Sequence, residues 1–232
     1  MPEKIIGILG GMGPEATIDL FYKIIKFMSA EKDQDHLRII IDNNPKIPDR
    51  TAAILGKGED PLPALQETAR NLEKAGADFI IIPCNTAHYF LPLIQESVKI
   101  PILNMIEETA KETRKRIPQI QKMGLLASIG IYETEIYHQQ FKKINIEVIS
   151  PEEKDKEEVM KAIYAVKAGN LSEGIKKSIL KIAQKLIDKG AEVIIAGCTE
   201  IPLILKEGDV SVLLIDPTQV LAKAAVQKAR LL

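Results

Sequence analysis

Two cysteines are the residues whose type and placement best suit chemistry. Cys84 and Cys198 are the two cysteines of the chain, and each directly follows an apolar run typical of a buried strand. The segments at 76–86 and 190–200 repeat one pattern, Gly-Ala-acid, then the strand, then cysteine. A lone cysteine after a strand is commonly a small core residue. Two at equivalent points of a repeat, each followed by polar residues, favour a functional pair.

A pair of thiols suits proton transfer on two faces of one carbon atom. A thiolate removes a proton from one face, a thiol delivers a proton to the other, and the roles exchange with the direction of reaction. Each cysteine precedes a predicted helix, whose N-terminal dipole favours the thiolate. If that carbon is the α-carbon of an amino acid, loss of its proton leaves a carbanion. Without pyridoxal phosphate, this carbanion must be stabilised by desolvation and by hydrogen-bond donors around the α-carboxylate. Two cysteines alone cannot complete a four-ligand zinc site.

Polar residues and glycines near the predicted strand ends offer such donors. The loop Gly10–Pro14 follows the first predicted strand, and its backbone N–H groups could face a carboxylate, or the loop is an ordinary tight turn. Asn85, Thr86 and Thr199 either cap helices or contact substrate. Glu200 either orients or deprotonates Cys198, or is a solvated residue of a first helical turn.

Two cations are candidates for binding an acidic substrate. Arg50 lies in the polar segment 43–51, where a guanidinium can grip a carboxylate in bidentate fashion; alone, it would suit an ion pair with Asp49. Lys167 lies near the end of a predicted helix, where its charge also complements the helix dipole. His88, four residues after Cys84, could touch that cysteine, but its position favours a partly buried structural histidine.

Apolar β-branched runs alternate with segments of helical period, which predicts an α/β fold with parallel sheets flanked by helices. The repeat indicates two similar lobes whose strands end at one cleft, because ligands of such sheets bind at the carboxyl ends of strands. Expected strands are 4–10, 38–42, 78–83, 100–104, 123–128, 144–149, 192–197 and 211–215. Expected helices are 14–29, 61–75, 86–98, 106–116, 134–143, 152–168, 171–189, 199–206 and 217–230.

The amino-acid composition limits the classes of partner and the cellular location that the sequence predicts. The formal net charge of −1 gives no reason to expect nucleic acid or an anionic membrane as partner. No apolar run approaches the ~18 residues that a membrane helix needs, and the N-terminal segment lacks the features of a signal peptide. We therefore expect a cytoplasmic protein whose thiols stay reduced.

Seven segments together resemble the aspartate/glutamate racemase family, most closely its aspartate racemase branch. They are 7–14, 43–51, 54–60, 83–88, 105–108, 167–170 and 197–200, in the expected order along nearly the whole chain. The resemblance implies a homodimer of cofactor-independent racemase subunits, each with two lobes related by pseudo-twofold symmetry. It implies a first lobe of residues 1–99 with 209–232, a second lobe of 100–208, and an active site between them.

The resemblance also implies roles for single residues. Cys84 and Cys198 match the acid–base pair, and Arg50 and Lys167 match positions at the substrate carboxylates. The matches to substrate-contacting positions are Met12, Asn85, Thr86 and Thr199.

One segment departs from the family pattern. Where relatives have Ala-Thr-x-Gly-Thr, this chain has Ala127-Ser-Ile-Gly-Ile131. Ser128 keeps a hydroxyl near the substrate and Ile131 loses one, so the pattern leaves the choice between aspartate and glutamate open.

Two other functions use some of the same features. A nicotinamide-dependent dehydrogenase would use the Gly-rich turn and Asp42 at the end of the second strand, but the glycine spacing is wrong and the cysteine repeat is unexplained. A two-lobed amino-acid-binding or sensor protein would use the same cleft but needs no thiol pair.

Overall fold

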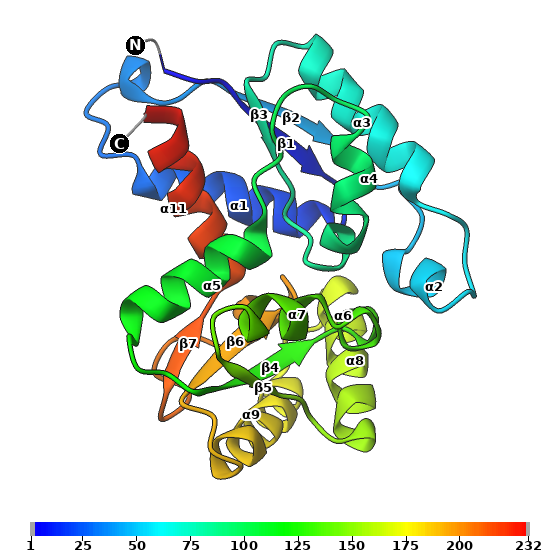
Figure 1. Cartoon of the computed structure of the whole chain (residues 1–232), viewed down its shortest axis with the longest axis vertical. Helices are drawn as coiled ribbons and strands as arrows, with labels where there is room; N and C mark the ends of the chain where they lie inside the picture. Colours follow the sequence, from blue (N-terminus) through cyan, green and yellow to red (C-terminus); the bar gives the residue numbers. More distant parts are fainter. Residues whose placement is uncertain (1–2, 231–232) are drawn as a thin grey trace. The chain divides into compact units, whose positions relative to one another are not determined.

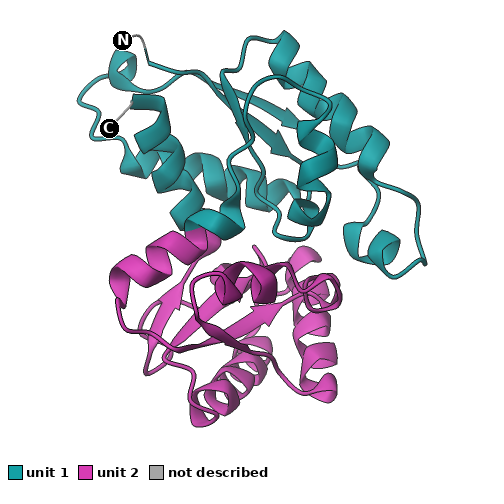
Figure 2. Cartoon of the chain, in the orientation of Figure 1, with its two compact units in different colours: residues 1–108, 218–232 teal, residues 109–217 magenta. Residues whose placement is uncertain are grey.

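Parallel strands form the centre of each of the two units into which the computed structural model divides (Figures 1 and 2). The structure describes residues 3–230. One unit holds residues 1–108 and 218–232, and the other holds 109–217. The strands are β1 (Ile6–Gly10), β2 (Ile39–Asn43), β3 (Phe79–Ile81), β4 (Lys122–Ala127), β5 (Glu147–Ile149), β6 (Val193–Gly197) and β7 (Leu213–Ile215).

The helices occupy most of the chain between these strands. The α-helices are α1 (Pro14–Phe27), α2 (Arg50–Ile54), α3 (Leu62–Lys74), α4 (Leu91–Gln95), α5 (Met105–Arg116), α6 (Ile129–Thr134), α7 (Ile136–Lys142), α8 (Glu153–Lys167), α9 (Glu173–Asp188), α10 (Ile201–Ile204) and α11 (Pro217–Arg230). Two 3₁₀ turns, η1 (Asp33–Asp35) and η2 (Thr86–Phe90), complete the order.

The two sheets have the same strand order. In the first unit β1 lies between β2 and β3, all parallel, and a parallel bridge from Ile80 to Ile102 extends the sheet beyond β3. In the second unit the order is β5-β4-β6-β7, again all parallel. This confirms the predicted α/β fold of two like parallel sheets. It also makes β3 and β6, the strands before the two cysteines, equivalent.

Alternating residues of the first sheet divide its core into two layers. Ile6, Ile8, Phe79 and Ile81 pack with α1 and α11. The neighbouring residues Leu9, Ile80 and Ile82 pack with α3 and the segment that follows Cys84. Both faces are therefore apolar, as a parallel sheet between helices requires, and Figure 1 shows α3 and α4 apart from α1 and α11.

The second sheet is buried in the same way. Every residue of β6 is buried, and Ile194 and Ala196 belong to a cluster with Val159 of α8 and Ile182 of α9. Tyr137 and Phe141 of α7 are fully buried, with stacked rings 5.9 Å apart.

Several predicted elements differ from those observed, mostly because of proline. The predicted strand 100–104 is a single bridge, since Pro101 cannot donate to a ladder. The predicted helix 86–98 is η2 followed by α4, and the predicted helix 199–206 is only α10; each short α-helix has proline in its first turn. The predicted helix 134–143 is α7, preceded by α6. The polar segment 43–51 contains no predicted helix, but α2 begins within it at Arg50.

The observed units correct the predicted lobe boundaries. We expected residues 1–99 with 209–232, and 100–208. Residues 100–108 belong to the first unit because the Leu103 N–H donates to the Ile80 carbonyl at 2.9 Å. Residues 209–217 belong to the second because β7 pairs with β6. The segment from Thr218 onward lies in the first unit.

Within residues 3–230 no helix is long and apolar enough to cross a membrane.

Candidate active site

Cys84 is a free, buried thiol at the carboxyl end of β3. Its side chain is 6% exposed and belongs to one apolar cluster with Met12, Ile47 and Ala87. Asn85 and Thr86, the polar residues that follow it, are also buried. Three predicted site residues of the first unit are therefore consecutive and begin just beyond the end of β3, after Ile82 and Pro83.

His88 ties the backbone at Cys84 to the start of α5. Its Nδ1 lies 2.8 Å from the Cys84 carbonyl oxygen, and its Nε2 accepts the Met105 N–H at 3.1 Å. Because Nε2 accepts, the ring proton is assigned to Nδ1, which donates to Cys84. The imidazole is 5% exposed and belongs to a buried backbone bridge. The sequence spacing relates His88 to Cys84 but gives no sign of the link to Met105.

This bridge predicts a pH dependence of stability. The pKa of His88 is lowered to about 4, chiefly because burial disfavours the charged imidazolium, whereas an unfolded histidine titrates near ~6.5. Between these values the unfolded chain binds a proton that the folded chain excludes. The free energy of unfolding should therefore fall by up to about 3 kcal/mol as the pH is lowered from ~6.5 to ~4. Above pH ~6.5, His88 should cause no further change of this free energy with pH.

Urea unfolding of the native chain and of His88→Gln across this pH range measures the effect. Above pH ~7 the two differ only by lost packing and hydrogen bonds, since the imidazole is neutral in both states. The difference between them should shrink as pH falls. Parallel pH profiles of the two proteins would contradict the buried neutral imidazole.

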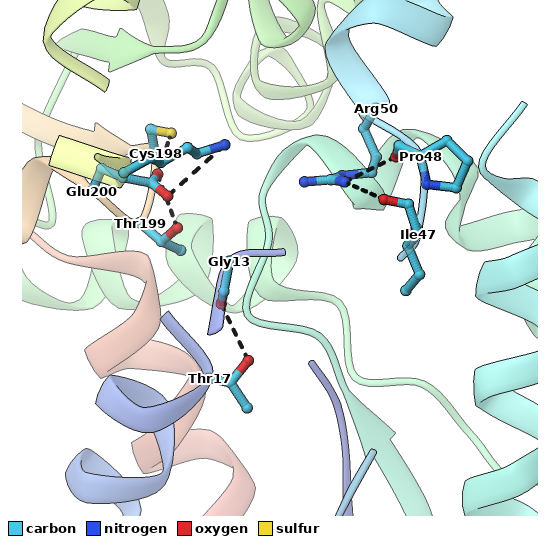
Figure 3. Close-up of polar contacts among 9 residues, drawn as sticks. Gly13, Thr17, Ile47, Pro48, Arg50, Cys198, Thr199 and Glu200 are labelled. Atoms are coloured by element: carbon cyan, nitrogen blue, oxygen red, sulfur yellow. Dashed lines mark hydrogen bonds and ion pairs between the residues drawn. The ribbon is translucent and has the colours of Figure 1, made fainter. Parts of the chain in front are cut away.

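The glycine-rich loop after β1 is fixed by contacts to both sides. Gly11 has φ +98°, and a Cβ there would lie 2.3 Å from the backbone of Asn44. The Gly11 N–H donates to Thr17 Oγ1 at 2.9 Å, and Thr17 Oγ1 donates to the Gly13 carbonyl at 3.3 Å, which Figure 3 also shows. This arrangement places Met12, 3% exposed, in the apolar cluster of Cys84.

Arg50 is buried rather than paired with Asp49 at the surface. The Asp49 carboxylate caps α2 by accepting the Ala52 N–H at 2.7 Å. Arg50 Nη1 donates to the carbonyls of Ile47 and Pro48 at 3.2 and 2.9 Å (Figure 3). Within residues 3–230, its buried Nε has no hydrogen-bond partner. Burying an unsatisfied cationic donor is costly, so this guanidinium is suited to an anionic ligand.

Cys198 directly follows β6 and is joined to a carboxylate. Its Sγ lies 2.9 Å from Glu200 Oε2, and Thr199 Oγ1 donates to the same oxygen at 3.2 Å (Figure 3). Lys167 Nζ, at the end of α8, lies 4.0 Å from Glu200 Oε1. Cys198, Thr199 and Glu200 are all buried. Glu200 is therefore not the solvated residue that its position in a first helical turn also allowed.

The electrostatics at Cys198 reverse one expectation. We expected a helix N-terminus to favour the thiolate, but α10 has four residues. The pKa of Cys198 is raised well above its usual value, first by burial and then by the negative charge of Glu200, while Lys167 acts in the opposite direction. The resting group is consequently a thiol that donates to Glu200.

Tyr132 is a buried neighbour of this site that sequence reasoning missed. Its hydroxyl accepts the Ala127 N–H at 2.9 Å and donates to the Leu125 carbonyl at 3.0 Å. Burial raises its pKa, and the negative charge that Cys198 carries when it ionises adds to this shift. Ser128, at the start of α6, and Ile131 are buried in the same turn. Tyr132 follows a predicted strand end by about one helical turn, and a buried tyrosine needs a hydrogen-bond partner for its hydroxyl. This position is the feature of the sequence that could have indicated it.

The structure thus assembles two groups of the predicted residues, one in each unit. Cys84 and Met12 share a cluster in the first unit, and Lys167, Cys198, Thr199 and Glu200 are linked in the second. Among the described residues no group of three or more His, Cys, Asp or Glu side chains is placed to hold a metal ion. Asp42, the acid that a dehydrogenase would use, accepts a hydrogen bond from Asn71 at 3.3 Å.

Comparison with known proteins defines the class. The profile of the Asp/Glu/Hydantoin racemase family matches residues 9–225. The chain therefore belongs to this family, which assigns it to the amino-acid racemases, a class of isomerases.

Particular relatives match over nearly their full length. The chain is 31% identical to the broad specificity amino-acid racemase RacX of Bacillus subtilis (strain 168) over 229 residues, 96% of each chain. It is similar to the solved structure of Picrophilus torridus aspartate racemase, with TM-score 0.86 and 34% identity, covering 98% of this chain and 94% of that one. An aspartate racemase homologue from Pyrococcus horikoshii matches with TM-score 0.78 and 29% identity, covering 98% and 99%.

Proposed function

We propose that the chain interconverts the enantiomers of an acidic amino acid, preferably aspartate, by a two-thiol mechanism that needs no pyridoxal phosphate. The observation that carries this proposal is the equivalence of β3 and β6, each followed by a free, buried cysteine. Equivalent strand ends in two like sheets are where two opposed groups with the same chemistry would be expected. The similarity to an aspartate racemase supports the preferred substrate.

The proposed step transfers one proton on each face of the α-carbon. The thiolate of one cysteine takes the α-proton and becomes a thiol, leaving the electron pair on carbon. The thiol of the other cysteine then donates its proton to the opposite face and becomes a thiolate. Each turnover exchanges the two protonation states, so the reverse reaction begins from the product state. The pair titrates as one coupled system.

The contacts of Cys198 suit it to the donor role in the resting enzyme. Its raised pKa keeps the proton on sulfur, and Glu200 orients the S–H. In this state the reaction needs Cys84 as the thiolate. When Cys198 acts as the base instead, Glu200 can accept its proton first, which leaves a thiolate whose negative charge Lys167 stabilises.

Two cations match the two carboxylates of the substrate. We assign Arg50, whose Nε lacks a partner among residues 3–230, to one carboxylate and Lys167 to the other. Met12, Asn85, Thr86, Ser128 and Thr199 complete the proposed substrate contacts. Ile131 is fully buried and offers no hydroxyl. Since the chemistry needs both thiols reduced, we also propose a reducing, cytoplasmic location.

Incubation with L-aspartate in deuterium oxide, without added pyridoxal phosphate, tests the proposal. We expect D-aspartate to accumulate with deuterium at the α-carbon, because solvent exchanges with both thiols before they donate. L-glutamate in a parallel reaction measures the substrate preference. The Cys84→Ala, Cys198→Ala double variant, purified in the same way, controls for contaminating racemases. Absence of exchange with both amino acids would refute activity on acidic substrates.

A further inference from the structure

The pairing of β4 with β5 stops before β4 itself ends. Gly124 with Ile149 is the last pair of the two strands. The Glu147 N–H donates to the Gln121 carbonyl at 2.7 Å, and every second residue of a parallel strand bonds its neighbour in this way. Two positions beyond Ile149, the next residue in this phase is Pro151, which has no N–H to donate. Proline thus explains why the ladder ends at this point.

The Tyr132 hydroxyl takes the place of the missing strand residue. A residue with an N–H at position 151 would bond the Leu125 carbonyl and the Ala127 N–H, which are the next two groups on this side of β4. The hydroxyl bonds these same two groups, since it donates to the Leu125 carbonyl at 3.0 Å and accepts the Ala127 N–H at 2.9 Å. Both groups are buried and would be costly to leave unpaired.

The ring of Tyr132 is held by a second helix. The side chain is buried, and Lys156 Nζ of α8 lies 5.2 Å from the ring centroid, within reach of a cation–π contact. Lys156 is itself fixed by donating to Glu153 at 2.6 Å. The hydroxyl therefore reaches β4 from a side chain that packing has already placed.

The strand end that this hydroxyl completes is next to the strand end of Cys198. Ala127 pairs with Gly197 in the parallel ladder of β4 and β6. Ser128 and Cys198 consequently leave two neighbouring strands, which lie about 4.8 Å apart in a sheet. The contact is tight, because a Cβ on Gly197 would lie 2.7 Å from Leu125 Cδ1. A shift of the end of β4 would thus move Ser128 relative to the thiol.

We infer that Tyr132 is a positioning residue of the proposed racemase site, whose hydroxyl completes the ladder of β4 and so holds Ser128 beside Cys198. The inference rests on the proposed function, in which Ser128 contacts the substrate and Cys198 is one of the two thiols. The single hydroxyl proton of Tyr132 is already donated to a backbone carbonyl. Tyr132 therefore acts through the turn that it fixes, and takes no part in proton transfer.

Tyr132→Phe tests the inference kinetically, because it removes the hydroxyl and keeps the ring. In the folded variant we expect the KM for L-aspartate to rise by about tenfold while kcat falls by less than about threefold, since a substrate contact is displaced and both thiols remain. The double variant with Ser128→Ala should be no worse than Ser128→Ala alone, because Tyr132 acts through Ser128. An unchanged KM, or fully additive losses, would overturn the positioning role.

Amide hydrogen exchange followed by nuclear magnetic resonance tests the same bridge without any activity. The Ala127 amide should exchange about tenfold faster in Tyr132→Phe, because its hydrogen-bond partner is gone. The amide of Ile195 in the middle of β6 is the internal reference, and its smaller change would measure the loss of global stability. Equal acceleration of both amides, or a native rate at Ala127, would show that the hydroxyl does not hold this strand end.

Tyr137→Phe is the matched control. It makes the same chemical change at a fully buried tyrosine whose hydroxyl bonds the Thr109 side chain instead of β4. Negative charge on Cys198 contributes to raising the pKa of both tyrosines, so the control separates the bridge to β4 from proximity to the thiol. It should keep the native exchange rate at Ala127 and a KM within about twofold of the native value.

The outcomes separate this inference from the proposed function. A control that matches Tyr132→Phe in both measurements would overturn the inference while the racemase activity stands. A native chain that turns over neither aspartate nor glutamate would refute the proposed function and with it the role of Tyr132 in that reaction. Circular dichroism melts establish that every variant is folded at the temperature of the measurements.

Discussion

Replacing either cysteine with alanine is expected to lower the interconversion of aspartate enantiomers by about 10³-fold or more, because acid and base catalysis contribute on this scale. The variants should lose inversion of the α-carbon but keep exchange of the α-proton on one face. A variant with one thiol can still remove and return a proton on the face that this thiol serves. Each variant should therefore incorporate solvent deuterium into one enantiomer without inverting it, and the two variants should choose opposite enantiomers.

Nuclear magnetic resonance of each pure enantiomer in deuterium oxide measures exchange and inversion separately. Cys84→Ser and Cys198→Ser are the matched controls, since serine nearly preserves the volume and hydrogen bonding of the side chain but not the acidity of the thiol. They should be as inactive as the alanine variants. If either single variant keeps two-way interconversion within a few-fold of the native rate, the two-thiol assignment is wrong.

Glu200→Gln is expected to lower kcat by about 100-fold, because the amide can still orient Cys198 but cannot accept its proton. It should also change the titration of the thiol. Burial and then the charge of Glu200 raise the pKa of Cys198, so removing that charge should lower the pKa. The thiolate should consequently form at a lower pH in the variant, even though its turnover is slower.

The titration is measured in a Cys84→Ala background, where Cys198 is the remaining cysteine of the chain. The rate of alkylation by iodoacetamide follows the thiolate fraction, so its pH midpoint should shift downward with Glu200→Gln. Glu207→Gln makes the same chemical change at an exposed residue of the following loop and should leave the midpoint in place. Identical midpoints in all three proteins would exclude electrostatic coupling between Glu200 and Cys198.

The sequence predicts a strand correctly where burial on both faces makes every residue of that strand apolar. β3 and β6 are apolar at every position because helices cover both sheet faces, and this same pattern revealed the repeat. The bridge at Ile102 was overestimated as a strand because an apolar segment after proline has the composition of a strand but cannot make its full ladder.

The site was less predictable because its contacts join distant positions. The spacing of Cys198 and Glu200 suggested a contact, but only the fold brings Lys167 to the same carboxylate. The position of the Arg50 guanidinium depends on the turn at Ile47 and Pro48, whose carbonyls accept its hydrogen bonds. The sign of the pKa shift at Cys198 depends on burial, which a helix-dipole argument from sequence does not include.

The return of α11 to the first unit determines the order in which the chain can finish folding during synthesis. Residues 109–217 form a continuous unit, whereas the first unit also needs Leu221, Ala222 and Ala225 against Ile6 and Ile8. The Lys4 N–H donates to the Ala229 carbonyl at 3.0 Å. A nascent chain that has passed residue 217 holds all of the second unit, but the part of the first sheet that packs against α11 is still uncovered. The half that is made first is thus completed last, with apolar surface exposed to chaperones until its final helix emerges from the ribosome.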